Sequence, residues 1–379
     1  MNRAGSFVKQ LSGDMQYKSF SPTPLQELKL TEIDSELSSL LADTSASLGR
    51  LDGMASYIPD VDLFVSLYIR KEALLSSQIE GTQATLDDIL DSEIEENKNT
   101  HVSDVLNYIK ATQFALDRMR ELPVCNRLLK EIHAQLLAGI RGGEKNPGEF
   151  RRSQNWIGPA GGSIKNATFI PPTPDDMTQA MSNLEKYINM DDSHVNALIR
   201  TALIHYQFET IHPFLDGNGR IGRLLISLFL MSEGVLAKPI LYISYFLKLN
   251  RIEYYDRLME VRNKGNYEQW IRFFIKALHQ TSEDAIDTIN RLVSLREKNR
   301  KAISALGRTK NVLRVYEYIE KSPIIDISKT SAALELSFMA VSRAVEKLCE
   351  LGILQQTEST KRNRCFAYEE YLRILRKDT

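Results

Sequence analysis

HPFLDGNGR, residues 212–220, brings a histidine, an aspartate, two glycines and an arginine together within nine positions. It lies between an apolar helix predicted over residues 194–211 and a second helix predicted over residues 220–233. Pro213 cannot donate a backbone hydrogen bond and is expected to end the first helix, so His212 is predicted at the exit from a helix into a loop. Side chains at such an exit face a cleft, where an imidazole is available as a base.

The loop after the histidine has the composition of an anion site. Gly217 and Gly219 flank Asn218 and allow the backbone N–H groups to converge. The helix begun by Arg220 adds its own unpaired N–H groups and the positive end of its dipole. Arg220 and Arg223 are three residues apart and therefore share one face of the first turn. Two guanidinium groups beside an amide nest suit a polyphosphate better than a single carboxylate.

Asp216 and His212 supply the remaining chemistry at this loop. Asp216 directly precedes the glycines and can hold Mg²⁺ against bound phosphates, which leaves His212 as a base beside an anchored electrophile. The plain alternative is a glycine-containing turn with two surface arginines, but six such residues within twelve positions argue against it. The chain contains no GxxxxGK[ST] motif, so the phosphates would be held by arginines and amides without a P-loop lysine.

The segment HPFLDGNGRIGR resembles the signature of Fic-domain proteins, HxFx(D/E)GNGRxxR, and matches it at every fixed position. The resemblance implies transfer of AMP from Mg-ATP to a Ser, Thr or Tyr hydroxyl of a target protein, and of the enzyme itself. His212 would deprotonate the hydroxyl, Asp216 would hold Mg²⁺, and residues 217–219 with Arg220 and Arg223 would cradle the triphosphate. The local residues alone leave open which phosphate is attacked, so phosphoryl or phosphocholine transfer remains an alternative.

Two further segments are similar to parts of the same family. NPGEFRRSQNWIG and ATFIPP resemble the loop and flap upstream of the motif, with a short β-hairpin predicted near residues 167–170. The resemblance implies that the flap binds the backbone of the target by strand addition. The edge is assigned to Thr168, Phe169, Ile170 and Pro171. Inward packing of the Phe169 and Ile170 side chains is an equal alternative. In FLKLNRIEYYDRL, Asn250 and secondarily Tyr255 are assigned to an adenine pocket.

LLSSQIEGT, residues 74–82, ends a helix predicted over residues 62–81. Ser76 and Glu80 are four residues apart on one face, and Glu80 lies at the C-terminal end, where the helix dipole disfavours a carboxylate by about 0.3–1 kcal/mol. The stretch resembles (S/T)xxxE(G/N), the inhibitory motif of Fic proteins, in the class that carries it before the core. The resemblance implies that Glu80 reaches Arg220 and takes the place of the γ-phosphate. It also implies that de-adenylylation at the same site is possible.

After Gly307 the sequence pattern changes to that of a second domain. Helices are predicted over residues 311–321, 328–334 and 339–351, followed by two strands around a basic turn. Three helices and a hairpin are the order of a winged helix. The third helix and the turn carry mixed charges: Arg343, Lys347, Lys361, Arg362 and Arg364 beside Glu346, Glu350 and Glu358. DNA binding and protein–protein contact are therefore both open.

Composition limits the remaining possibilities. A formal net charge of -1 over 379 residues excludes a grossly basic nucleic-acid binder but not a local basic patch. Three scattered cysteines are too few for a disulfide framework or a zinc site, which favours a reduced, cytoplasmic setting. The N-terminal residues lack the apolar run of a signal peptide, and no run is long enough to span a membrane, so no membrane partner is expected.

Residues 102–139 are predicted to form two helices split by Pro123, and further helices are predicted over residues 267–279 and about 282–304. The expected architecture is mainly α. It comprises an N-terminal helical region over residues 1–100, which carries the inhibitory helix, a Fic core over residues 101–305, and a winged-helix-like domain over residues 308–379. The flap hairpin and the wing are expected to be the only β structure. The expected partners are ATP, a target protein and a second copy of the chain. The alternative function is a winged-helix DNA-binding regulator whose Fic core senses nucleotide.

Overall fold

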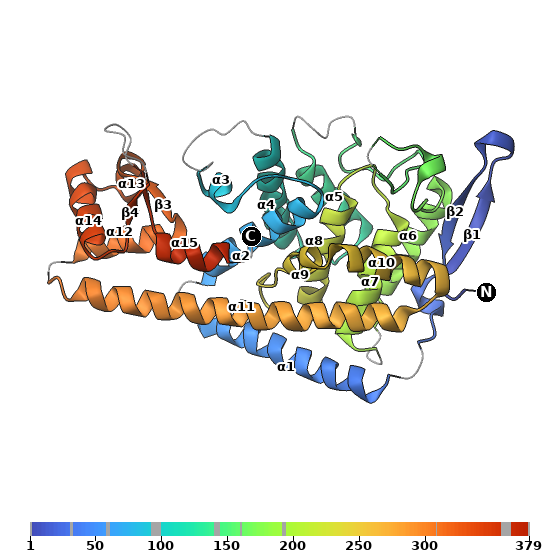
Figure 1. Cartoon of the computed structure of the whole chain (residues 1–379), viewed down its shortest axis with the longest axis horizontal. Coiled ribbons are helices and arrows are strands. Elements are labelled where there is room, and N and C mark those ends of the chain that lie inside the picture. Colours follow the sequence, from blue (N-terminus) through green and yellow to red (C-terminus); the bar gives the residue numbers. More distant parts are fainter. Residues whose placement is uncertain are drawn as a thin grey trace.

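The computed structural model describes residues 2–30, 33–57, 61–91, 100–139, 145–159, 161–191, 195–307, 309–357 and 365–377. The protein is mainly helical, as expected, and its long helix α11 (Tyr267–Ser304) runs along the molecule (Figure 1). Helix α1 (Ser35–Tyr57) packs along α11 from one side, and the remaining core helices lie on the other. The C-terminal unit, residues 309–357 and 365–377, lies at the far end of α11 from the N-terminus.

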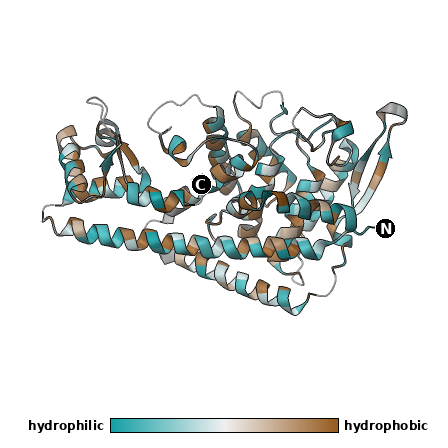
Figure 2. Ribbon diagram, in the orientation of Figure 1, coloured by the Kyte–Doolittle hydropathy of each residue, from teal (hydrophilic) through white to brown (hydrophobic). Residues whose placement is uncertain are grey.

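The centre of the core is α7 (Ala197–Ile211), which is buried at every position after its first residue. A helix that is buried on all faces must be surrounded by other elements, and α7 is packed against α6 (Pro174–Ile188), α8 (Asn218–Ser232) and α11 (Figure 2). Helices α7 and α8 approach so closely that a Cβ at Gly222 would clash with the side chain of Glu209. This close pairing fixes the loop between the two helices, which is the HPFLDGN segment.

Helix α2 (Val61–Ile79) packs between α4 and α9, and Gly81 follows it with φ of +96°. The helices expected on either side of Pro123 are present as α4 and α5. The elements that complete this part of the chain are α3 (Leu86–Asp91), α4 (Thr100–Arg118), α5 (Asn126–Leu136), α9 (Ser244–Leu249) and α10 (Arg251–Lys264). Short 3₁₀ turns lie at Gly13–Met15, Leu25–Glu27 and Ile164–Asn166.

The β structure differs from the expectation. Strands β1 (Gly5–Gln10) and β2 (Tyr17–Pro22) form an antiparallel hairpin near the N-terminus that was not predicted. It was missed because β1 is mostly exposed and so lacks the alternation of a half-buried strand. Conversely, the hairpin predicted near residues 167–170 is reduced to a single antiparallel bridge between Ile157 and Phe169.

Helix α11 also corrects a prediction. The sequence indicated one helix over residues 267–279 and another over residues 282–304, whereas the helix is continuous. Thr281 and Ser282 lie at the expected break, and both side chains are buried. Their hydroxyls donate to helix carbonyls one turn earlier, at Ala277 and His279, so these residues are accommodated without ending the helix.

The C-terminal unit consists of helices and a small antiparallel sheet with strand order β3-β5-β4. Its elements are α12 (Lys310–Lys321), β3 (Ile324–Asp326), α13 (Ile327–Leu334), α14 (Phe338–Glu350), β4 (Gln355–Gln356), β5 (Cys365–Ala367) and α15 (Glu369–Arg376). Strand β3 and helix α15 were not predicted. The basic turn, with Lys361, Arg362 and Arg364, and Glu358 lie outside the described residues. In the described part of the chain, no helix has both the length and the apolarity to cross a membrane.

Candidate functional site

His212 is the C-cap of α7 and adopts a left-handed backbone conformation (φ 50°, ψ 60°). Such a conformation is unfavourable for a non-glycine residue and persists only where the surroundings impose it. Here the His212 N–H donates to the Phe208 carbonyl at 2.9 Å. The His212 carbonyl accepts from Arg151 Nε at 3.0 Å and from Asn155 Nδ2 at 3.2 Å. The loop over residues 145–159 therefore holds the backbone of His212 in place.

The imidazole of His212 is in its neutral form at pH 7. Burial lowers its pKa to about 4, and the positive charges of Arg262 and Arg151 act in the same direction. The carboxylate of Glu80 acts in the opposite direction and does not offset them. Nδ1 of His212 is buried and has no hydrogen bond among the described residues. A neutral imidazole of low pKa can accept a proton from a substrate group.

The glycine loop begins α8. Gly217 is its N-cap with φ of +77°, a conformation that glycine adopts without strain. Asn218 is buried, and its side chain is used within the loop: Nδ2 donates to the Phe214 carbonyl at 2.8 Å, and Oδ1 accepts from the Phe214 N–H at 2.8 Å. The amide side chain of Asn218 thus locks the turn, so any contribution of Asn218 to anion binding comes from its backbone N–H.

His133 supports the same loop and was not singled out from the sequence. It accepts a hydrogen bond from the Gly148 N–H at Nδ1 (2.9 Å), so the proton is on Nε2, which donates to the Asp216 carbonyl (3.1 Å). The His133 ring stacks on the Phe214 ring with centroids 3.8 Å apart. Burial lowers the pKa of His133 to about 4. His133 therefore contributes to the loop as a neutral structural residue. No local pattern in the sequence distinguishes it from other helix residues.

Arg223 joins the glycine loop to α2. Its Nε donates to Ser76 Oγ at 2.8 Å, and Nη2 donates to the Ser76 carbonyl at 3.0 Å and to Glu80 Oε1 at 2.7 Å. The guanidinium is almost completely buried, with 1% of its side chain exposed. The sequence reasoning paired Glu80 with Arg220, but the ion pair is formed with Arg223. The end of α2 directs the carboxylate to the second arginine because Ser76, one turn earlier, already binds that arginine.

The carboxylate of Glu80 lies over the glycine loop. A Cβ added at Gly219 would clash with Glu80 Oε1 and approach the guanidinium of Arg223. Although burial acts to raise the pKa of Glu80, Arg223 and Arg220 hold it below its usual value, so the carboxylate is ionised. An anionic side chain therefore contacts the arginine and the backbone that the sequence assigned to phosphate.

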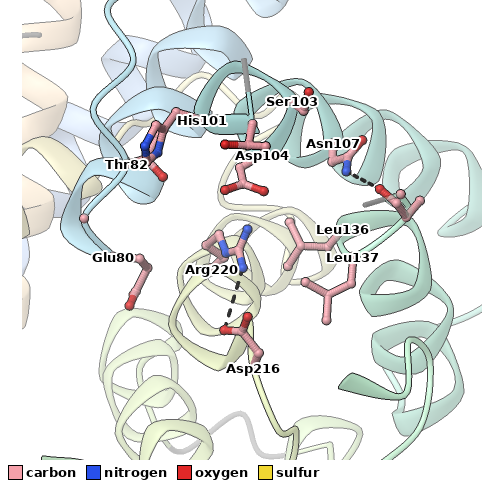
Figure 3. A pocket seen from close by; sticks show the side chains of 14 residues that line it. Glu80, Thr82, His101, Ser103, Asp104, Asn107, Leu136, Leu137, Asp216 and Arg220 are labelled. Carbon is pink, nitrogen blue, oxygen red and sulfur yellow. Dashed lines mark hydrogen bonds and ion pairs between the residues drawn. The ribbon is translucent and has the colours of Figure 1, made fainter. Parts of the chain in front are cut away.

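A cavity of about 500 Å³ opens beside Glu80, Asp216 and Arg220 (Figure 3). Asp104 of α4 points into it from the opposite wall. Arg220 Nη2 lies 3.9 Å from Asp216 Oδ1, while its buried Nε has no hydrogen bond among the described residues. The other lining residues are Gly81, Thr82, Thr100, His101, Ser103, Asn107, Leu136, Leu137, Ala138 and Gly139. The cavity gives the anion loop a polar, accessible neighbour.

Asp216 is the candidate metal ligand. About half of its side chain is exposed, and Oδ1 accepts from the Gly217 N–H at 2.6 Å. Among the described residues no group of three or more histidine, cysteine, aspartate or glutamate side chains could hold a metal. Mg²⁺ bound to nucleotides commonly uses one or two carboxylates, with phosphates and water as the other ligands. A single half-exposed carboxylate beside the anion loop fits that requirement.

The flap residues are largely used within the protein. The side chains of Phe169, Ile170 and Pro171 are buried, and only Thr168 is exposed. The Phe169 carbonyl accepts from the Ile157 N–H at 2.8 Å. The Ile170 carbonyl accepts from the Phe20 N–H of β2 at 2.9 Å. The alternative of inward packing therefore holds for Phe169 and Ile170, and their carbonyls are already paired.

Asn250 lies between α9 and α10 and is occupied as a cap. Its N–H and its Nδ2 both donate to the Phe246 carbonyl, at 3.0 and 2.9 Å. Tyr255, on α10, interacts electrostatically with residues of the candidate site. Burial and the charge of Glu80 raise its pKa, while Arg223 opposes them. Tyr255 is thus electrostatically coupled to Glu80 and Arg223.

Comparison with known families identifies two matching segments. Residues 38–117 match the Fic/DOC family N-terminal region, and residues 123–230 match the Fic/DOC family. The second segment contains Arg151, His212 and the whole glycine loop, and the first contains Ser76 and Glu80.

Curated relatives carry the name protein adenylyltransferase Fic. The protein from Culex quinquefasciatus is 34% identical over 188 residues, 49% of this chain and 33% of that protein. The protein from Aedes aegypti is 34% identical over 152 residues, 40% of this chain and 27% of that protein. The protein from Drosophila ananassae is 26% identical over 261 residues, 68% of this chain and 47% of that protein. The chain therefore spans less than half the length of these relatives.

Two solved structures share the fold. A Fic family protein from Desulfovibrio desulfuricans G20 superposes with a TM-score of 0.57 at 18% identity, covering 89% of this chain and 97% of that chain. A Fic domain containing signaling protein from Bacteroides thetaiotaomicron VPI-5482 superposes with a TM-score of 0.51 at 18% identity, covering 66% of this chain and 95% of that chain. At these identities the likeness concerns the fold alone.

Proposed function

We propose that this chain, which carries a Fic domain at residues 123–230 behind a Fic/DOC N-terminal region, is a protein adenylyltransferase. It would transfer AMP from Mg-ATP to a Ser, Thr or Tyr hydroxyl of a target protein and of itself. The names of the curated relatives support this activity. The observation that carries the proposal is the neutral imidazole of His212 beside a glycine loop with two buried arginines.

In this mechanism the target hydroxyl attacks the α-phosphorus of ATP. The hydroxyl proton passes to His212, the new bond forms between the hydroxyl oxygen and the α-phosphorus, and the bond to the β-phosphate oxygen breaks to release pyrophosphate. Nδ1 of His212 is buried, so Nε2 is the atom that accepts the proton. The loop N–H groups, Arg220 and Arg223 stabilise the charge on the phosphate oxygens. When bound at Asp216, Mg²⁺ would neutralise charge between the α- and β-phosphates.

The contact between Glu80 and Arg223 supports a second part of the proposal, autoinhibition. The carboxylate lies over Gly219 and occupies the guanidinium that the terminal phosphate of ATP would bind. ATP would then bind with its phosphates misplaced, and transfer of AMP would be suppressed. Ser76 contributes by binding the same guanidinium through its hydroxyl and its carbonyl. Release of Glu80 would restore Arg223 to the nucleotide.

The experiment for the transferase activity takes the Glu80→Gly chain, which lacks the inhibitory carboxylate, as the parent and compares it with the same chain carrying His212→Ala. Labelled AMP from α-labelled ATP should appear on the chain and on lysate proteins with the parent and be lost with His212→Ala. Nucleotide binding, measured by calorimetry, should be retained in His212→Ala. Mass spectrometry of the modified protein distinguishes AMP from a phosphoryl or phosphocholine adduct, and a decrease of pre-formed adduct would identify de-adenylylation. Equal labelling by the parent and His212→Ala would contradict the proposal.

We propose that the target protein contacts the flap at one residue only. Because the carbonyls of Phe169 and Ile170 are already paired, the exposed Thr168 is the flap residue we assign to contact with the target. Thr168→Pro should raise KM for the target protein and leave KM for ATP unchanged. Asn250 is retained as a second-choice adenine contact after Tyr255, because its Nδ2 already donates to the Phe246 carbonyl of α9.

For the C-terminal unit we propose a winged-helix module. Its support is the element order α12, β3, α13, α14, β4 and β5 and the antiparallel sheet. The exposed Phe338 and Met339 at the start of α14 are available for contact with DNA or protein. Salt-dependent binding to a promoter fragment, unchanged in His212→Ala, would favour the alternative of a DNA-binding regulator with a nucleotide-sensing core.

The cellular setting and the assembly are proposed on fewer grounds. Three free cysteines support a reducing, cytoplasmic location, which fractionation would test. A homodimer rests on the resemblance alone, and light scattering would test it.

A further inference from the structure

Arg262, near the end of α10, is buried beside the candidate site. Nε donates to Oγ1 of Thr210 at 3.1 Å, and Nη2 donates to the Glu209 carbonyl at 3.2 Å. The guanidinium carbon lies 3.8 Å from the centroid of the Phe169 ring, within the range of a cation–π contact. Nη1 lies 3.4 Å from the sulfur of Met259. These hydrogen-bond and ring partners are all uncharged, while the Glu209 carboxyl acts on Arg262 through its charge.

A guanidinium that is buried among neutral partners is costly to desolvate. Only 4% of Arg262 is exposed, and burial lowers its pKa. An apolar residue of similar volume would pack in this position at a smaller cost. The charge and the hydrogen bonds therefore indicate a role beyond filling space.

The contacts of Arg262 connect three parts of the site. Phe169 belongs to the flap and packs on Phe20 of β2 with ring centroids 5.9 Å apart. Glu209 and Thr210 precede His212 by three and two residues, at the end of α7. Arg262 is thus the link between the flap and the helix end that presents the imidazole.

Charges from three elements act on His212. Arg262 of α10 and Arg151 of the loop over residues 145–159 disfavour protonation, and Glu80 at the end of α2 favours it. After burial, Arg262 has the largest effect of the three. Arg151 also holds the His212 backbone, so Arg262 is the cation whose replacement leaves that backbone contact in place.

We propose that Arg262 is a positioning residue for AMP transfer: it fixes the flap against the end of α7 and adds a positive charge that, together with burial, holds His212 in its proton-accepting form. This inference rests on the proposed function only for its kinetic consequences. The state of the imidazole is measurable whether or not the chain transfers AMP.

Three substitutions separate the two roles. Arg262→Gln removes the charge and retains hydrogen-bond donors. Arg262→Lys keeps the charge and loses the planar fork that binds both α7 groups and covers the ring. Phe169→Leu removes the ring and leaves the arginine intact.

The first measurement is an NMR titration of the full chain labelled with ¹³C-histidine, between pH 5 and pH 8. The chain has six histidines, and the His212 signal is assigned by its loss in His212→Ala. His212 should remain neutral across this range in the parent, in Arg262→Lys and in Phe169→Leu. In Arg262→Gln its midpoint should rise by about one pH unit or more, into the range. A His212 signal that stays neutral in Arg262→Gln would overturn the electrostatic role.

The second measurement is the pH profile of AMP transfer to a protein target. In Arg262→Gln the acid limb of kcat/KM should move to higher pH. In Phe169→Leu and Arg262→Lys the acid limb of kcat/KM should stay at the same pH as in the parent. In both variants KM for the target should rise about threefold or more, and KM for ATP should not change. An unchanged target KM in both would overturn the link to the flap.

Circular dichroism checks that each variant is folded. If Arg262→Gln does not fold, Arg262→Met, which is also uncharged, takes its place in the titration, while Arg262→Lys still decides the link to the flap. Absence of AMP transfer in a Glu80→Gly chain would contradict the proposed function and leave the NMR result to decide the charge of His212.

Discussion

The carboxylate of Glu80 forms its ion pair with Arg223 while lying over the backbone of Gly219. A phosphate oxygen at this position would need the same guanidinium and the same backbone. The two anions therefore exclude one another, and the proposed inhibition depends on this one carboxylate.

Removing this carboxylate should increase the proposed AMP transfer. We expect Glu80→Gly to raise incorporation of AMP from α-labelled ATP by about tenfold or more, since a charge-assisted hydrogen bond contributes about 1.5–3 kcal/mol. Glu80→Gln keeps the size of the side chain and loses its charge, so its rate should lie between those of the parent and Glu80→Gly. Equal rates for the three proteins would show that the contact has no inhibitory effect.

The sequence allowed prediction of the residues that a contiguous motif contains. A contiguous motif of twelve positions contains His212, the glycines and both arginines, and their spacing within it indicated their roles. Arg262 could not be assigned in this way, because it reaches the site through contacts with Thr210 and Phe169, which are distant in the chain. The partner of Glu80 was predicted as Arg220 and is Arg223, since the choice depends on how α2 packs on α8.

Helix α2 is attached to its surroundings by a row of polar residues on one face. Glu72, Ser76 and Glu80 are successive at intervals of four. Glu72 accepts hydrogen bonds from the Ser244 N–H, at 3.1 Å, and from the Ser244 hydroxyl, at the start of α9. Burial raises the pKa of Glu72 to about 7, although both bonds from Ser244 act to lower it. Helix α2 is therefore held by a carboxyl group whose pKa is raised to about 7.

Glu72 should make stability depend on pH. Its pKa rises from about 4.5 unfolded to about 7 folded, so the folded chain binds more protons in this window and stability falls as pH rises through it. The Glu72→Gln variant has no titrating carboxyl group at this position and therefore does not lose stability in this way as pH rises. We expect its free energy of unfolding, relative to the parent, to improve by about 2 kcal/mol between pH 5 and pH 8 in urea titrations. Glu283→Gln, at an exposed ion pair with Arg50, is the control and should show no such trend. A parallel trend in both variants would contradict the assignment to Glu72.

Helices could be predicted from the sequence where their buried apolar residues recur with the period of an α-helix. Helices α2, α4, α5 and α14 are of this kind, and the sequence placed each within a few residues. The hairpin β1–β2 was missed because its side chains are mainly exposed, and its attachment to the flap depends on one hydrogen bond from Phe20 to Ile170. The division of α11 was predicted wrongly because polar residues in its middle are satisfied within the helix.

At the scale of the molecule, α11 joins the helical core to the C-terminal unit. Asn299 near the end of α11 donates to the hydroxyl of Tyr368, which also contacts the hydroxyl of Tyr316. Arg376 of α15 forms an ion pair with Asp87 of α3, in which Nη2 and Oδ1 are 2.9 Å apart. Asp87 follows Glu80 by only a few residues in the chain. These contacts bridge segments far apart in the chain, which is why the sequence analysis separated a domain at residue 308 without predicting how it is attached.

Because buried hydroxyl contacts cross from α11 to the C-terminal unit, the two parts should unfold together. Trp270 is buried in the core, so tryptophan fluorescence reports mainly on the core, whereas far-ultraviolet circular dichroism reports on all helices. The two signals should coincide in the parent during urea unfolding. Tyr368→Phe leaves the Asn299 amide without its buried partner, at a cost of about 1–3 kcal/mol, and should separate the transitions. Tyr371→Phe removes a bond to the Glu320 carbonyl within the unit and is the matched control. Coincident transitions in Tyr368→Phe would mean that the coupling of the two parts lies elsewhere.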